Sequence, residues 1–352
     1  MAPPTPGQIH AAIHADSPGI AELAVLLSPE AAPLVEEMAR KAQILARRHF
    51  GRTTMLYVPL YLSNYCTGGC AYCGFASDRD LPRQRLELDQ VEKELSALRR
   101  MGFAEVLLLT GERHPEADLD YVLECVRLAA ARFPNVTVEM FPLPTEEYER
   151  LCAAGCTGVT IYQETYDPAV YECMHRWGPK SDYLQRLEAP ERVLAAGMRT
   201  CGIGALLGLA SPLEDALSLY LHARRLQQTH WRAGVSVSFP RIRPQEGGFQ
   251  PPFPVDEAFL AQLIFAFRIV LPRTHLVLST REGVRFRDGM AGLGVTKMSA
   301  ASLTTVGGYS ESESESSGQF DVSDHRSVEE ICTMLRGKGL EPVFKNWDSV
   351  YR

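Results

Sequence analysis

Apolar runs of strand length alternate with amphipathic helical stretches through most of the chain. The first run, Met55–Leu62 (MLYVPLYL), precedes a helical pattern over 88–101 and a second run, Glu105–Thr110 (EVLLLT). The later runs are mostly rich in β-branched residues and flanked by helices, as parallel strands covered on both faces should be. Further strands are predicted over 136–141, 158–163, 199–206, 234–240, 275–279 and 294–299, and further helices over 119–132, 145–154, 183–196, 214–229, 256–270, 282–288 and 327–338.

Eight strands in alternation with helices predict an α/β fold, a (β/α)8 TIM-type barrel with its active site at the carboxyl ends of the strands. A doubly wound open sheet is the structural alternative, which periodicity alone does not exclude. We expect an N-terminal helical extension over 1–50, the barrel over 51–325, and a C-terminal helix and tail packing on the barrel over 326–352.

Within the extension, the Pro- and Ala-rich residues 1–16 are expected to be poorly ordered. A first helix is expected to begin with Ser17-Pro18 as its cap and first turn, and a second to span 29–49. One later stretch interrupts the alternation: Tyr309–Gln319 (YSESESESSGQ) is acidic and serine-rich, with almost nothing to bury. A solvated loop is the default interpretation, and a lid over the barrel mouth is the alternative.

Charge and composition narrow the functional classes. The net charge of -7 and the pI near 5.8 argue against nucleic acid as a partner, because phosphate binding requires a basic face. No apolar run reaches the ~18 residues of a membrane span, and the first residues lack the pattern of a secretory signal. Nine cysteines, an odd number, favour a reducing compartment. We therefore expect a cytoplasmic enzyme with no nucleic-acid or membrane partner.

Three cysteines lie close together directly after the first predicted strand. Cys66, Cys70 and Cys73 form a C-x3-C-x2-C loop with glycines that allow the backbone to turn. Three thiolates are one too few for a closed zinc site or an ordinary four-cysteine cluster, whereas a [4Fe-4S] cluster held by three cysteines leaves one iron open to a small molecule. A zinc site completed by His114 or His175 remains an alternative, because thiolates suit both metals.

Polar residues close several of the predicted strands. Glu112 follows the second strand and suits an ammonium group, and Glu164 follows the fourth and suits the two hydroxyls of a ribose. Arg186, on the next helix, is a candidate for binding a carboxylate. The alternatives are that Glu112 caps a helix and that Arg186 lies on the surface.

The seventh strand ends in Ser279-Thr280-Arg281-Glu282. Arg281 offers a planar fork for a carboxylate and Ser279 a hydroxyl donor, so the pair suits an amino acid substrate. The alternative is that Ser279 caps a helix while Arg281 lies in solvent. Tyr61 and Phe239 offer aromatic surface for the same pocket.

The cysteine loop, with Tyr72 before its last cysteine, resembles the radical S-adenosylmethionine (SAM) signature, and Thr110-Gly111-Glu112 resembles the Gly-Gly-Glu element of that superfamily. Taken together, several runs resemble one family, the 2-iminoacetate synthases, which are ThiH-type tyrosine lyases of thiamine biosynthesis. These runs are PLYLSNYCTGGCAYCGF, GFAEVLLLTGE, GVTIYQETY, RLEAPERV, GIGALLGL, SVSFPRIRP, LSTRE, VGGY and VFKNWDS, and they cover the chain from about residue 55 to 351.

This resemblance implies that a [4Fe-4S] cluster cleaves SAM to methionine and a 5'-deoxyadenosyl radical. The radical takes hydrogen from the amino group of L-tyrosine, and the Cα–Cβ bond breaks to give 2-iminoacetate and p-cresol. It further implies a thiazole synthase as protein partner and a flavodoxin- or ferredoxin-type electron donor. The residue roles implied are Cys66, Cys70 and Cys73 for the cluster, Glu112, Glu164 and Arg186 for SAM, and Ser279, Arg281 and Tyr61 for tyrosine, with no catalytic residue beyond the cluster and the SAM radical.

Three alternatives remain. The related tyrosine lyase of [FeFe]-hydrogenase maturation carries a second cluster on a C-terminal cysteine motif, whereas here only Cys332 lies beyond Cys201. A radical SAM lyase for another aromatic amino acid, such as tryptophan, is harder to separate. A non-enzymatic iron-sulfur or zinc protein would explain the cysteines but not Ser279 and Arg281 at another strand end.

Overall fold

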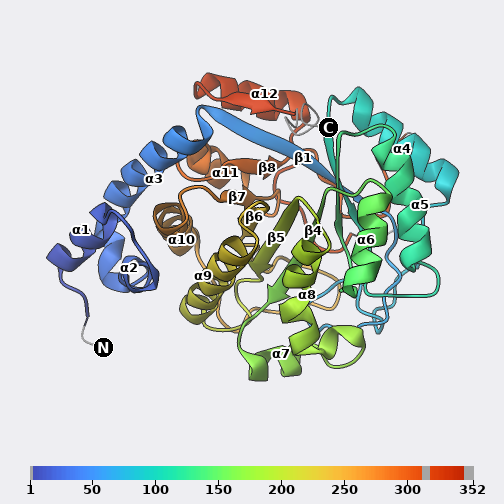
Figure 1. The fold of residues 1–352 in the computed structure, drawn as a ribbon, viewed down its shortest axis with the longest axis horizontal. Coiled ribbons are helices and arrows are strands. Elements are labelled where there is room, and N and C mark those ends of the chain that lie inside the picture. Colours follow the sequence, from blue (N-terminus) through green and yellow to red (C-terminus); the bar gives the residue numbers. More distant parts are fainter. Residues whose placement is uncertain (1–2, 311–317, 345–352) are drawn as a thin grey trace.

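The computed structural model of the protein describes residues 3–310 and 318–344. Its parallel strands close into a ring, because β1 (Thr53–Tyr61) pairs with both β2 (Glu105–Leu109) and β8 (Lys297–Ser299). Helices surround this ring (Figure 1). The closed ring confirms the predicted (β/α)8 barrel and excludes the open sheet. Between β2 and β8 the order is β3 (Asn135–Glu139), β4 (Gly158–Glu164), β5 (Thr200–Ala205), β6 (Gly234–Ser238) and β7 (His275–Leu278).

The surrounding helices follow the predicted pattern to within a few residues at each end. Several begin at an aspartate whose side chain accepts a backbone N–H of the first turn, as Asp118, Asp182 and Asp256 do. Between the strands run α4 (Leu88–Arg100), α5 (Leu119–Ala130), α6 (Thr145–Ala153), α8 (Tyr183–Ala195), α9 (Pro212–Thr229), α10 (Glu257–Val270) and α11 (Val284–Met290), and α12 (Val328–Gly337) follows the barrel.

Successive strand residues face opposite sides of the barrel wall. In β3, Val136 and Val138 pack in the aliphatic core beneath the helices, whereas Asn135 and Glu139 line cavities in the barrel interior. β2 follows the same rule: Val106 and Leu108 join the core under the helices, and Leu107 and Leu109 face inward. The period-2 pattern therefore decides which side chains are available to a ligand in the barrel.

The described part of the N-terminal segment, from residue 3, is ordered, contrary to the prediction made for residues 1–16. Thr5 and Gln8 form a capping box that starts α1 (Pro6–His14), and this helix buries Ile9 and Ile13. A Thr followed by Pro and, three residues on, by Gln is a helix-start pattern that outweighs the Pro- and Ala-rich composition. Figure 1 shows α1 at one side of the barrel, beside α2 and α3.

The next two helices begin later than predicted. Ser17-Pro18 precedes α2 (Ile20–Leu26), whose cap is Gly19 with Glu22 bonded to its N–H at 2.7 Å. Residues 29–34 form a 3-10 turn, η1 (Pro29–Leu34), and α3 spans Val35–Phe50. In an α-helix the Pro33 ring would clash with the carbonyl of residue 29, which disfavours that geometry and leaves the tighter turn.

Besides α1, two short elements of the barrel region and the C-terminal segment lie where no element was predicted. α7 (Pro168–Met174) is a single short helix capped by Asp167, and β9 (Glu341–Val343) pairs in parallel with the start of β1. The division of the chain into 1–50, 51–325 and 326–352 stays a prediction. Of the acidic loop 309–319, residues 311–317 lie outside the described residues. Within the described ranges, no helix combines the length and the apolar character needed to cross a membrane.

A buried ion pair ties the segment before α12 to the barrel. Arg287 is fully buried and its guanidinium contacts the Asp324 carboxylate and the Ser299 carbonyl. Asp324→Asn is expected to lower the free energy of unfolding by about 3–5 kcal/mol, because it leaves the Arg287 charge buried without its counter-ion. Chemical denaturation would measure this. The control Asp288→Asn, which removes a partly exposed partner of Arg326, should cost no more than about 1 kcal/mol. Equal effects would contradict the prediction.

Candidate active site at the carboxyl end of the barrel

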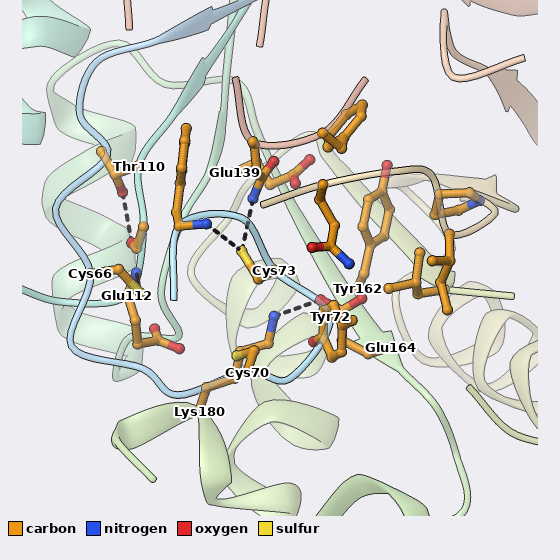
Figure 2. A pocket seen from close by; sticks show the side chains of 18 of the residues that line it. Cys66, Cys70, Tyr72, Cys73, Thr110, Glu112, Glu139, Tyr162, Glu164 and Lys180 are labelled. Carbon is orange, nitrogen blue, oxygen red and sulfur yellow. Dashed lines mark hydrogen bonds and ion pairs between the residues drawn. The ribbon is translucent and has the colours of Figure 1, made fainter. Parts of the chain in front are cut away.

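The cysteine loop crosses the carboxyl end of the barrel directly after β1 (Figure 2). Backbone hydrogen bonds from Ala71 N to the Met174 carbonyl (2.9 Å) and from Gly69 N to the Trp177 carbonyl (3.0 Å) hold it against the end of α7 and the residues that follow. On the other side of the loop, Gly111 lies against the loop backbone. A Cβ at this position would be 2.4 Å from the Tyr65 carbonyl oxygen. Glycine is needed at that strand end because the loop backbone rests on it.

Two of the three sulfurs accept N–H hydrogen bonds. Cys66 Sγ receives the backbone N–H of Gly68 and that of Glu112, each at 3.3 Å. Cys73 Sγ receives the backbone N–H of Phe75 at 3.4 Å and the Gln319 amide at 3.6 Å. Such donors stabilise thiolates that bind iron-sulfur clusters and tune their reduction potential.

Burial raises the pKa of the Cys66 thiol to about 11 and that of Cys70 to about 12. Both thiols therefore stay protonated near neutral pH until a metal centre replaces the proton. A thiol with a raised pKa is not a free reactive cysteine, and the buried Cys125, Cys156 and Cys201 show the same rise.

The zinc alternative fits this geometry poorly. Sulfurs bound to one zinc at about 2.3 Å each lie no more than about 4.6 Å apart. Among the described residues, one group of three His, Cys, Asp or Glu side chains has its ligand atoms within 4.8 Å of one another. That group is His10, His14 and Glu37 of the N-terminal extension, so the three cysteine sulfurs are farther apart than one zinc ion allows. Of the two candidate fourth ligands, His175 is engaged at both ring nitrogens, by the Tyr72 hydroxyl and the Tyr171 carbonyl at 2.7 Å each, and His114 Nδ1 accepts the Glu116 N–H.

Two carboxylates and an arginine lie beside the loop. Glu112, Glu164 and Arg186 are all buried, with Arg186 between the carboxylates at 4.0 Å from Glu112 and 3.6 Å from Glu164. Neither alternative interpretation applies, since Arg186 is not on the surface and α5 is capped by Asp118 instead of Glu112. Glu112 Oε1 has no hydrogen-bond partner in the described structure, and Glu112 lines the cavity. An unpaired buried carboxylate oxygen at this place suits a ligand ammonium group.

Glu164 is held in an unusual backbone conformation. Its φ is +71°, in the left-handed region, where β4 is irregular after Tyr162. Such a conformation costs about 1–3 kcal/mol and occurs mostly at functional positions. Burial alone would raise the pKa of Glu164, but Lys180 at 2.6 Å and Arg186 outweigh it, so the pKa lies below its usual value. Glu164 is therefore an anion and a strong hydrogen-bond acceptor.

The three residues predicted for the substrate lie deeper in the barrel. Tyr61, Ser279 and Arg281 line one cavity, and Arg281 also lines the cavity that holds the three cysteines. Arg281 lies over the Phe320 ring at 3.3 Å and has no carboxylate partner among the described residues. Gly283 caps α11, so the alternative of Ser279 as its cap is not what the structure shows.

Four further residues at the cavities were not predicted. Glu139, at the end of β3, and Tyr162, in β4, line both cavities. Lys180 and Gln319 line the cavity that holds the three cysteines. The position of Glu139 at a strand end, on the inward-facing parity of β3, is a signal that could have identified it. Lys180 and Gln319 lie in irregular segments whose placement only the tertiary structure determines.

Comparisons with known proteins identify the family of this chain. Residues 60–221 match the Radical SAM superfamily model, and residues 238–341 match the Biotin and Thiamin Synthesis associated domain. The chain is 40% identical to 2-iminoacetate synthase of Escherichia coli over 346 residues (98% of this chain, 92% of that protein), and 41% identical to that of Salmonella typhimurium over 329 residues (93% and 87%).

Among solved structures, the fold is similar to HydG, a maturase of the [FeFe]-hydrogenase, with a TM-score of 0.90 and 30% identity over 97% of this chain and 76% of that one. HydG from Carboxydothermus hydrogenoformans gives a TM-score of 0.88 at 34% identity, over 96% and 79%. The near full-length identity to the two bacterial enzymes exceeds that to HydG. The chain belongs to the 2-iminoacetate synthase family of the radical SAM superfamily.

Proposed function

We propose that this chain cleaves the Cα–Cβ bond of L-tyrosine to give 2-iminoacetate and p-cresol, with SAM converted to methionine and 5'-deoxyadenosine. Full-length identity of 40–41% to 2-iminoacetate synthases is the observation that carries this proposal. The product supplies thiazole formation in thiamine biosynthesis. The function is that of a carbon-carbon lyase.

In this proposal, Cys66, Cys70 and Cys73 hold a [4Fe-4S] cluster. When bound, the cluster and SAM supply a hydrogen-abstracting radical. The N–H···S bonds to Cys66 and Cys73 support their role as ligands, and the unpaired Glu112 oxygen supports binding of the SAM ammonium group.

The remaining SAM contacts are assigned by charge. Glu164 accepts hydrogen bonds from the ribose hydroxyls, because its lowered pKa keeps it ionised. Arg186 binds the SAM carboxylate, and Lys180, which contacts Glu164, stands near enough to share that role. The chain itself therefore orients the cofactor and contributes no evident general-base dyad to its cleavage.

At the substrate end, Arg281 binds the tyrosine carboxylate with Ser279 beside it, and Tyr61 gives aromatic surface to the cavity. The described end of the acidic loop supports an enclosed chamber: the Tyr61 hydroxyl donates to Gln319 at 2.8 Å, and Gln319 contacts Cys73. Burial of this kind protects a radical from water and oxygen.

We further propose a thiazole synthase as the partner that receives the short-lived product, and a flavodoxin- or ferredoxin-type protein as electron donor. A reducing cytoplasm is the proposed location, supported by nine cysteines that are all unpaired.

The test is anaerobic reconstitution with iron and sulfide, followed by incubation with SAM, dithionite and L-tyrosine. The expected products are p-cresol and glyoxylate, the hydrolysis product of 2-iminoacetate. SAM cleavage without p-cresol would keep the superfamily and reject tyrosine as substrate, with L-tryptophan as the next amino acid to assay. Carbon monoxide or cyanide would favour the hydrogenase-maturation alternative.

Glu112→Gln is expected to weaken SAM binding about ten- to a hundredfold, because it removes a charge-assisted hydrogen bond worth about 1.5–3 kcal/mol. Equilibrium dialysis with SAM, without reductant, would measure the loss. Glu116→Gln, four residues on and partly exposed, is the matched control and should bind SAM as the unaltered protein does. Unchanged affinity of Glu112→Gln would contradict the assignment.

A further inference from the structure

Glu139 is a carboxylate of the barrel interior to which no role has yet been given. It ends β3 and lines both the cavity that holds the cysteines, of about 120 Å³, and the deeper one with Ser279 and Arg281, of about 70 Å³. Figure 2 draws it among the side chains that line the same cavity as Glu112 and Cys73. It therefore lies where the cofactor cavity meets the substrate cavity.

The other carboxylates of these cavities are already engaged or assigned. Glu164 is paired with Lys180 and Arg186, and Glu282 with Arg241 and Arg243. Glu112 stands next to Cys66, beside the cluster ligands. The Glu139 side chain, in contrast, has neither a hydrogen bond nor an ion pair with any other described residue. Glu139 is half-buried, and an anion in the barrel interior without a partner is costly, so a cationic ligand would offset that cost.

The substrate has a cation of the right kind. If Arg281, which lines both cavities, holds the carboxylate of an α-amino acid, the ammonium group is one carbon away and must also lie at the junction. The nitrogen is the atom that reacts, and loss of a hydrogen atom from an amine requires that the ammonium group first give up a proton. A carboxylate at the junction can both bind the ammonium and accept that proton.

We propose that Glu139 binds the substrate ammonium group and accepts the proton that it loses before the nitrogen reacts. This inference rests on the proposed function. In this step one N–H bond of the ammonium breaks and one O–H bond forms, so R–NH3⁺ and the Glu139 carboxylate become R–NH2 and a neutral carboxylic acid. No electrons are exchanged, and the carboxyl returns its proton to solvent or product when the chamber opens.

The surroundings suit such an exchange. Burial, and then the charge of Glu164, raise the pKa of Glu139 to about 7, against smaller opposing effects of Arg281, Lys180 and Arg186. A carboxyl that titrates near neutrality accepts and releases protons with little free-energy cost. The charged or titratable groups that face it are Tyr57 and Tyr61 of β1, Tyr162 and Glu164 of β4, Lys180 of η2 (Pro179–Ser181), Arg186 of α8 and Arg281 after β7.

The first test is binding without turnover. Calorimetry on the reconstituted protein with SAM and no reductant would compare L-tyrosine with 3-(4-hydroxyphenyl)propanoate, which lacks the amino group. The unaltered protein should bind tyrosine more tightly than the analogue. In Glu139→Gln the affinity for tyrosine should fall about ten- to a hundredfold, while the affinity for the analogue stays the same. The same preference in Glu139→Gln would overturn the proposal. Glu149→Gln, exposed on α6, is the control.

The second test is the pH profile of p-cresol formation. Glu139 must be ionised to accept a proton, so kcat/KM of the unaltered enzyme should fall as the pH drops below about 7. Glu139→Gln should lose this acidic limb, and Glu139→Asp should restore it in part. An acidic limb that persists in Glu139→Gln would assign it to another group and contradict the proposal. If the unaltered enzyme forms no p-cresol, the proposed function itself fails, which the binding comparison distinguishes.

Discussion

Cys70→Ala is expected to abolish cluster binding and with it all p-cresol formation. Cys70 is buried at the centre of the loop, and the backbone on both sides of it is fixed by the hydrogen bonds of Gly69 and Ala71. A fixed loop cannot bring another thiol into the vacant place, so two thiolates would remain for a centre that needs three. Iron and sulfide analysis after anaerobic reconstitution, with the visible absorption of the cluster, measures the effect.

The matched control is Cys173→Ala, which removes an exposed thiol on α7 and should leave iron content and turnover unchanged. Circular dichroism would show that both variants are folded. Four irons per chain and turnover in Cys70→Ala would contradict the assignment of the cluster, and loss of iron in Cys173→Ala would show that the cysteine loop alone does not account for the metal.

Arg281→Ala is expected to weaken L-tyrosine binding about ten- to a hundredfold and to leave SAM binding unchanged. The guanidinium lies over the Phe320 ring and is free to pair with a carboxylate that enters the cavity, an interaction worth about 1.5–3 kcal/mol. Calorimetric titrations with tyrosine and with SAM, each without reductant, separate the two ligands. Arg281→Lys keeps the charge but not the planar fork and should recover only part of the affinity.

Arg285→Ala is the control for Arg281, because Arg285 is exposed on α11 and outside both cavities. It should bind both ligands as the unaltered protein does. Equal loss of SAM and tyrosine binding in Arg281→Ala would mean that Arg281 shapes the whole chamber and does not recognise one carboxylate.

The barrel was predictable because its signals are local and repeated. Each strand is a short apolar run between capped helices, and the closed ring follows from eight such units. The failures were also local: the capping box at Thr5 and Gln8 was overlooked, and Pro33 turns the start of the second predicted helix into a 3-10 turn. Short elements such as α7 and β9 carry too few residues for a periodic signal.

The chemistry of the site divides in the same way. Cys66, Cys70 and Cys73 are neighbours in the chain, so their spacing alone predicted a three-thiol ligand loop after a strand. Glu112, Glu164, Ser279 and Arg281 could be proposed from the sequence because parallel strands of a barrel bring their carboxyl ends to one face, wherever those strands lie in the sequence.

Only the tertiary structure decided how these groups meet. The contacts that matter join residues from distant segments. They are the pairing of Glu164 with Lys180 and Arg186, and the hydrogen bond from the Gln319 amide to the Cys73 sulfur. The unpaired oxygen of Glu112 and the position of Glu139 between two cavities likewise depend on how distant segments pack. The periodicity of hydrophobic positions in the sequence indicates which face of its own helix or strand a residue occupies. It carries no information on which side chain of another element lies opposite, because that depends on the closure of the barrel and on loops without a repeating pattern.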